Sequence, residues 1–174
     1  VIGHDSVIGS SVWITQTVSP NTTVVLEKPQ LRVRGGAGED TISIGTYSSE
    51  VNSVQVRGNE GNDTLNLNLT SLDGTASSVD LQGNAGNDVI LVTADDDIYD
   101  STIGGGKGAD DITYVGGTFN DSTLIGGFGT DTATADMDVK SSLIQLGNGT
   151  DDATDSSDTL IYSGMIANST VKGG

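Results

Sequence analysis

A short glycine-rich loop that ends in aspartate recurs six times along the chain. Apolar residues flank each copy at the same distances, and successive copies are separated by 20 to 25 residues. A repeat of this length is typical of a solenoid, in which each unit forms one coil and stacks on its neighbours. The six loops end at Asp40, Asp63, Asp88, Asp110, Asp131 and Asp151.

The residues around each loop alternate between apolar and polar, which indicates half-buried β-strands. Seven residues before the aspartates stand Val33, Val56, Leu81, Ile103, Leu124 and Ile144. Two residues after them stand Ile42, Leu65, Ile90, Ile112, Ala133 and Ala153. We expect these sets to form two inward columns of an all-β, parallel β-solenoid (β-helix- or β-roll-like), with the second column narrowing at its alanine end.

The loops carry glycine or asparagine where the chain must turn sharply, because these residues adopt positive φ at lower cost than others. Such loops let carbonyl oxygens point inward beside the aspartate, and hard oxygen ligands are those that calcium prefers. We therefore predict one glycine-aspartate calcium loop per coil. Besides the six aspartates, the candidate ligand positions are Gly36, Gly38, Asn59, Gly61, Asn84, Gly86, Gly106, Gly108, Gly127 and Gly129.

The pattern G-[GN]-x-G-x-D-x-h-x, where h is apolar, resembles the calcium-binding repeats of secreted RTX (haemolysin-type) proteins. The resemblance covers roughly residues 31 to 162 and implies an extracellular protein that folds when it binds calcium. Two features depart from the family pattern. The chain has one loop per coil instead of two, so the second corner must turn by other means, and Leu146 replaces the first glycine of the sixth loop.

Composition limits the remaining options. The formal net charge of −17 excludes a basic footprint for nucleic acid. A hydrophobic content of 34% with 4% aromatic residues suits a narrow solenoid core better than a thick two-layer core, and disorder is the alternative. There is no cysteine and no apolar stretch long enough to insert into a membrane. We expect a mature or excised extracellular segment, since position 1 is Val.

Several features outside the loops have two interpretations. Residues 1–30 hold the only Trp, at position 13, and form either a cap or a docking segment, with the solenoid occupying 31–174. A second acidic set lies between the loops; its members are either turn formers or extra calcium ligands, with Asp95 to Asp97 the best candidates. This set comprises Glu50, Asp73, Asp95, Asp96, Asp97, Asp121, Asp136, Asp138, Asp155 and Asp158.

Polar motifs on the strands and return segments also leave alternatives open. Arg34 and Arg57 occupy the same position in successive coils, where Glu39 or Glu60 could compensate them or an anionic sugar could bind. The sequons at Asn68, Asn120 and Asn168 are candidate glycan sites.

The leading functional hypothesis is a calcium-stapled structural or adhesive element of the cell surface, without enzymatic activity. A β-helical polysaccharide-acting enzyme is an alternative, but the only His is at position 4 and no base shares a coil with an electrophile. A carbohydrate- or ice-binding face is a third, although the residue after each loop aspartate varies.

The two ends of the chain suggest assembly. The last residues match the approach to a loop, and the first residues supply a Gly-x-Asp-x-apolar continuation through Asp5. We therefore expect one unit of a tandem array or a filament of copies joined head to tail, with a calcium site at each junction, and surface polysaccharide as a further candidate partner.

Overall fold

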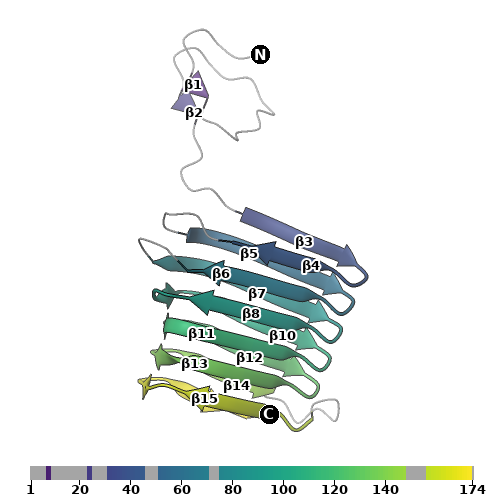
Figure 1. Cartoon of the computed structure of the whole chain (residues 1–174), viewed down its shortest axis with the longest axis vertical. Coiled ribbons are helices and arrows are strands. Elements are labelled where there is room, and N and C mark those ends of the chain that lie inside the picture. The colour runs from purple at the N-terminus through teal and green to yellow at the C-terminus, as the bar shows by residue number, and fades with distance from the viewer. Residues whose placement is uncertain are drawn as a thin grey trace.

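The computed structural model describes residues 7–8, 23–24, 31–45, 51–70, 75–147 and 156–173, and these are all-β, without a helix. Figure 1 shows strands stacked as successive coils. The strands are β1 (Val7–Ile8), β2 (Thr23–Val24), β3 (Leu31–Ala37), β4 (Thr41–Ile44), β5 (Val51–Glu60), β6 (Thr64–Leu69), β7 (Ala76–Ala85), β8 (Val89–Ala94), β9 (Ile98–Tyr99), β10 (Thr102–Lys107), β11 (Asp111–Asn120), β12 (Thr123–Phe128), β13 (Thr132–Lys140), β14 (Leu143–Gly147), β15 (Thr159–Ser163), β16 (Ile166–Ala167) and β17 (Thr170–Lys172).

Equivalent strands of successive coils pair in parallel, which confirms the predicted β-solenoid. Strands before the loops pair in the order β3, β5, β7, β10, β12, β14, β17. Strands after the loops pair in the order β4, β6, β8, β11, β13, β15. The short strands β1 and β2 form a separate parallel pair; the interpretation of residues 1–30 as a cap or docking segment otherwise falls outside the described residues.

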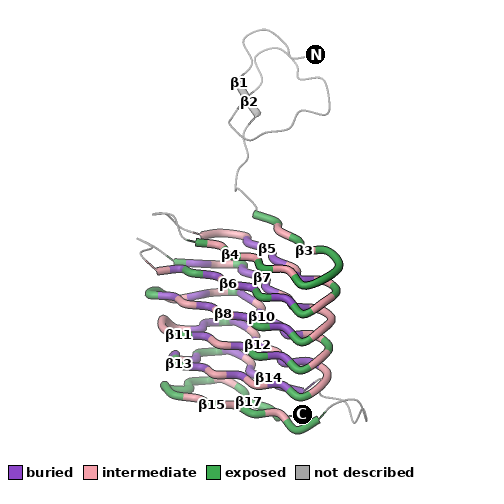
Figure 2. Tube along the Cα trace, turned by 45° about the vertical axis from the view of Figure 1, so that its right-hand side comes forward, coloured by how far each residue is buried: buried purple, intermediate pink, exposed green. Residues whose placement is uncertain are grey.

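Both predicted inward columns exist, and the first is complete. Val33, Val56, Leu81, Ile103, Leu124 and Ile144 are consecutive register partners, and Val171 extends the column. The internal members are at most 1% exposed. Figure 2 shows buried positions alternating with exposed ones along the inner coils, as a narrow core with period-two strands requires.

The last coil corrects the second column. Asp151 and Ala153 lie outside the described residues, and Leu160 instead of Ala153 is the register partner of Ala133. Asp158 accordingly takes the place after Asp131 in the aspartate column, so the final step is 27 residues. The expected narrowing to alanine at the end is therefore wrong, since a leucine follows Ala133.

Serines make the second corner. A residue with positive φ turns the chain here, including Asp100 at 48° and Asp121 at 45°. A serine follows it from Asp100 onward, whereas Val54 and Val79 follow Ser53 and Ser78 in the earlier coils. Ser101 N–H donates to Ser122 Oγ, and Ser122 N–H donates to Ser142 Oγ, both at 3.0 Å. Each of these serine hydroxyls also donates to a carbonyl two residues earlier. The corner opposite the glycine loops is thus held by buried hydroxyl groups.

Candidate metal centre in the aspartate ladder

The loop aspartates form a hydrogen-bonded ladder along one corner of the solenoid. The backbone N–H of each aspartate donates to Oδ1 of the aspartate in the next coil. The distances are 2.8 Å for Asp40 to Asp63, for Asp63 to Asp88 and for Asp88 to Asp110. They are 3.0 Å for Asp110 to Asp131 and 2.9 Å for Asp131 to Asp158. Because donor and acceptor sit on opposite sides of each coil, the ladder has a direction.

The second carboxylate oxygen of the ladder is buried without a hydrogen-bond donor. This holds for Oδ2 of Asp40, Asp63, Asp88, Asp110 and Asp158. The internal side chains are almost completely enclosed, with 1% exposure at Asp63 and 2% at Asp110. A buried, unpartnered carboxylate oxygen costs free energy unless it is protonated or meets a cation.

Burial also disturbs the acidity of these groups. The pKa of Asp110 is raised to about 7, chiefly by desolvation. The hydrogen bond from the backbone of Asp88 opposes this shift, and the charges of Asp131 and Asp88 add to it. Desolvation likewise raises the pKa of Asp88, with Asp63 adding to the effect. Without a cation, the middle of the ladder therefore resists ionisation near neutral pH.

The first glycine of each loop brings backbone oxygens to the same place. A Cβ added to Gly35 would lie 2.5 Å from Asp40 Oδ2 and 2.7 Å from the carbonyl oxygen of Gly58 in the next coil. Gly58, Gly83 and Gly105 each lie beside an equivalent pair, namely Oδ2 of their own loop aspartate and a carbonyl oxygen of the next coil. Only glycine fits here, because any side chain would displace the carboxylate or the backbone.

The donor set fits a hard cation such as calcium, with one condition. A carboxylate oxygen and a carbonyl oxygen from successive coils converge at each loop, and calcium accepts both kinds of ligand. Within the described residues, however, no three Asp, Glu, His or Cys side chains gather as a metal-binding group. A cation here would depend on backbone carbonyls and on one carboxylate from each coil.

The other predicted loop residues lie where the turn requires them. The second loop position has φ of 129° at Gly36, 88° at Asn59, 82° at Asn84, 120° at Gly106 and 123° at Gly127. Positive φ also occurs at Gly38, Gly61, Gly86, Gly108 and Gly129, two residues before the aspartates. Asp5 and Asp151 lie outside the described residues, and Asp158 is a ladder member that the sequence prediction placed at the opposite corner.

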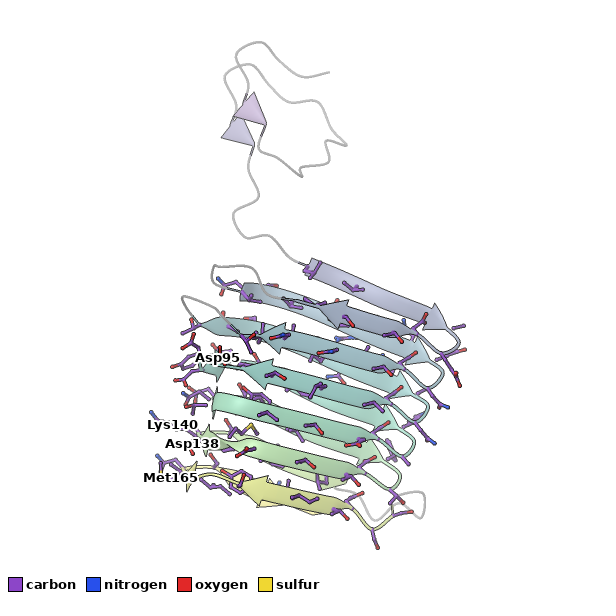
Figure 3. All side chains as sticks on the ribbon, viewed as in Figure 1. Asp95, Asp138, Lys140 and Met165 are labelled. Atoms are coloured by element: carbon purple, nitrogen blue, oxygen red, sulfur yellow. The ribbon has the colours of Figure 1, made fainter. Side chains whose placement is uncertain are left out.

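The second acidic set does not assemble into a further metal cluster among the described residues. Asp95 and Asp96 are exposed, and Asp97 accepts a hydrogen bond of 2.9 Å from Tyr99 Oη. Figure 3 labels Asp95 and Asp138 on the side of the solenoid away from the aspartate ladder. The interpretation of Asp121 as a turn former is correct, given its positive φ.

Arginines cluster on the outer face of the first coils. Arg34 and Arg57 are register partners, as predicted. The partner of Arg57 is Asp80, through an ion pair, and not Glu39 or Glu60. Partial burial favours a higher pKa for Asp80, but hydrogen bonds from Arg57, Gln82 and Gln55 outweigh it and lower the pKa.

The candidate glycan residues differ in accessibility. Asn68 is exposed, and its Oδ1 accepts hydrogen bonds from the N–H and hydroxyl of Thr70, while Asn168 is also exposed. Asn120 is only 6% exposed, so the folded protein does not present it to a glycosylating enzyme. Among the three candidates, the structure therefore favours Asn68 and Asn168 over Asn120.

A pocket of about 360 Å³ lies at the last coil, and its described lining includes Leu146, Asp158, Leu160, Val171 and Lys172. No helix among the described residues is long and apolar enough to cross a membrane. In comparisons with known proteins, no family model, curated protein or solved structure matches the chain.

Proposed function

We propose that this chain is a calcium-stapled β-solenoid segment of an extracellular protein, with a structural or adhesive role and no enzymatic activity. The observation that carries the proposal is the column of buried carboxylates, each with one oxygen that lacks a donor. Their placement beside carbonyl oxygens of the next coil supports calcium over a softer metal.

In the proposed mechanism, the aspartates and the loop carbonyls would bind a cation at each coil junction, and the cation would supply the positive charge that the ladder lacks. Equivalent strands are spaced by about 4.8 Å, so ionised carboxylates in adjacent coils repel each other. Calcium would thereby favour stacked coils over separated ones, which couples folding to the metal. A calcium-rich extracellular medium would make such a segment rigid.

The test is a thermal melt followed by far-UV circular dichroism, in millimolar calcium and after chelation with EGTA. Calcium is expected to raise the melting temperature, and readdition after EGTA should restore it. Magnesium at equal concentration is the control, because its smaller octahedral shell suits flexible carbonyl loops poorly. Identical melting with and without calcium would contradict the proposal.

A second candidate function is binding of an anionic surface polysaccharide at the arginine cluster. Arg32, Arg34 and Arg57 lie on one outer face of β3 and β5 in a chain with only seven basic residues. Arginine suits planar carboxylate and sulfate groups. Binding of a uronate polymer that is lost in Arg34→Ala, while melting is unchanged, would support this second function. The pocket at the last coil is not part of this arginine cluster, since its described lining residues include no arginine.

A further inference from the structure

We propose that Asn68 is an acceptor site for an N-linked sugar, which is transferred from a diphosphate-activated donor to the folded solenoid. The inference goes beyond the structural role and does not depend on the calcium sites. It follows from the hydrogen bonds of the Asn68 amide, the space beside it and the different surroundings of the other described sequons.

Asn68 stands on the outer side of β6, between two residues that anchor the strand. Leu67 and Leu69 are each 1% exposed and belong to the core. Because successive side chains of a strand point to opposite faces, the Asn68 side chain points outward, and it is exposed. Strand β6 itself pairs with β4 on one side and β8 on the other, so this is the outer surface of an internal coil.

The sequon Asn68-Leu69-Thr70 is folded into a turn that polarises the amide. Oδ1 of Asn68 accepts a hydrogen bond of 3.0 Å from Thr70 N–H and one of 2.8 Å from the Thr70 hydroxyl. Two donors on the carbonyl oxygen draw electron density from the amide and make the Nδ2 protons more acidic. Among the described residues, Asn68 Nδ2 donates to no acceptor, so the reacting nitrogen is available.

The structure leaves room for a sugar beside Asn68. The register pair Ile44 and Leu67 places Gly45, the next residue in the coil before, beside Asn68. Gly45 is exposed, and a Cβ added to it would meet no atom within 4 Å outside its chain neighbours. In the coil after, the register partner of Asn68 is Thr93, which has a short side chain. A glycan is bulky and hydrophilic, so it needs an open outer position of this kind.

Two of the other sequons lack this combination because their polar groups hold the fold. Asn62 is exposed, but its Oδ1 accepts the backbone N–H of Asn87 at 2.8 Å and so fixes the next coil. Asn120 is only 6% exposed. The hydroxyl of its sequon, on Ser122, donates to the backbone carbonyl of Asn120 and not to the side-chain amide.

The sequon at Asn168 has an exposed asparagine but a different turn. The N–H of Thr170, two residues later, donates to the carbonyl of Ser142 at 2.9 Å and so pairs with the preceding coil. This N–H is therefore not available to polarise the Asn168 amide. The fold thus distinguishes Asn68 from sequons that the sequence motif alone presents as equivalent.

The transfer balances without an oxidant or a reductant. One Nδ2–H bond of Asn68 breaks, and a bond from Nδ2 to C1 of the sugar forms. The C1–O bond to the donor phosphate breaks, and the diphosphate leaves with the bonding electron pair. The transferring enzyme supplies the donor and the base that takes the proton.

The experiment treats the full folded chain with two enzymes and measures the occupancy of each sequon by peptide mass spectrometry. One is a soluble N-glycosyltransferase with a nucleotide-activated hexose, and the other is an oligosaccharyltransferase with a lipid-linked donor. A tryptic digest of the same chain shows what each enzyme modifies without the fold. In the folded chain, occupancy at Asn68 should exceed that at Asn62, Asn120 or Asn168 by about tenfold, the effect of one ordinary hydrogen bond. The digest should lose most of this preference.

Three variants test the role of the hydroxyl. Thr70→Val keeps the shape of the side chain but removes its hydrogen bond to Asn68 Oδ1, so occupancy at Asn68 should fall about tenfold. Thr93→Val is the matched control, since it makes the same substitution at the register partner of Asn68, and it should be modified like the wild type. Thr70→Ser keeps a hydroxyl and should retain most of the occupancy. Circular dichroism should show all three variants folded.

Each outcome decides the inference. Modification of Asn68 by one enzyme or by both supports the acceptor site and identifies the source of the donor. An unmodified Asn68 in the folded chain with both enzymes overturns the inference, as does equal occupancy in Thr70→Val and the wild type. Occupancy of Asn120 or Asn168 as high as that of Asn68 in the folded chain overturns the selection by the fold. Because none of these results depends on how calcium changes the melting temperature, a failure here leaves the proposed calcium role intact.

Discussion

Replacing Asp110 by Asn tests whether the ladder is a cation site or a stack of protonated carboxyl groups. The amide keeps an oxygen to accept the N–H of Asp88, which donates to Oδ1 at 2.8 Å. It replaces the buried Oδ2 by an NH₂ group beside Gly105, which the carbonyl oxygen of Gly126 also approaches. The variant therefore removes the charge, places a donor in this region and keeps the size of the side chain.

The expected gain in the metal-free protein follows from the pKa of Asp110. This pKa is about 7 in the folded chain against an ordinary 3.8, and the difference corresponds to about 4 kcal/mol at 1.36 kcal/mol per pH unit. Because the pKa of Asp110 is higher in the folded chain than in the unfolded chain, the free energy of unfolding of the wild type falls as the pH rises from about 4 through about 7. In EGTA, Asp110→Asn should thus be more stable than the wild type by up to about 4 kcal/mol at about pH 8, and nearly equal to it at about pH 4.

Calcium should reverse this order. A site filled at one hundred times its Kd adds about 2.7 kcal/mol to the free energy of unfolding, and Asp110 would contribute to the junctions on both sides of its coil. Loss of both sites would remove about 5 kcal/mol from the variant relative to the wild type, which exceeds the gain in EGTA. The reversal of sign is specific to a cation ligand.

The assay is urea unfolding followed by circular dichroism, in calcium and in EGTA. Asp111→Asn is the matched control, since Asp111 is the next residue, carries the same charge and is exposed; its effect should be small under both conditions. If Asp110→Asn stabilises the chain equally with and without calcium, the ladder is a protonated stack and the cation site is refuted. If it destabilises the chain in EGTA at high pH, the argument from the buried oxygen is wrong.

Two further substitutions test the two corners. Ser122→Ala leaves Ser101 N–H and the carbonyl of Asn120 without their partner, so it should lower the free energy of unfolding by about 1 to 3 kcal/mol, equally in calcium and EGTA. Thr123→Ala, at the next residue, should cost less. Gly106→Ala should lower the melting temperature strongly, because Gly106 has φ of 120° and a Cβ would strike the carbonyl of Asn84. Gly104→Ala is its control, since there the nearest atoms belong to the flexible side chain of Gln82. Equal melting temperatures for the two alanine variants would contradict this reading of the loop.

The repeat made the strand columns predictable, because each loop aspartate fixes the positions of its apolar neighbours. The same logic failed after Asp131. Gly149 and Asp151 match the loop spacing, whereas Ser156-Ser157-Asp158 lacks the glycines, yet Asp158 occupies the ladder. The signal that favours Asp158 is the run from Thr159 to Tyr162 after it, because β-branched, aliphatic and aromatic residues favour a strand more than the residues after Asp151 do.

Contacts between coils were harder to predict than contacts along the strands. The ion pair of Arg57 with Asp80 is diagonal, since the register partners are Gln55 with Asp80 and Arg57 with Gln82. A one-dimensional alignment compares residues in the same column and misses such neighbours. Charge repulsion between Arg34 and Arg57 was predicted, but the carboxylate that relieves it in the next coil was not.

The second corner of each coil could not be predicted from the carboxylates, because serine hydroxyls form it in the later coils. Ser101, Ser122 and Ser142 recur two residues before an inward residue, at a spacing as regular as that of the aspartates. Both ladders use one side-chain oxygen to accept the N–H of the preceding coil, and so both fix the register without a metal. Serine has no second oxygen, whereas aspartate keeps one that remains buried and without a donor. A solenoid that needed only register could use serine at both corners, and the cost of the extra oxygen is therefore the strongest reason to look for a cation at the aspartate corner.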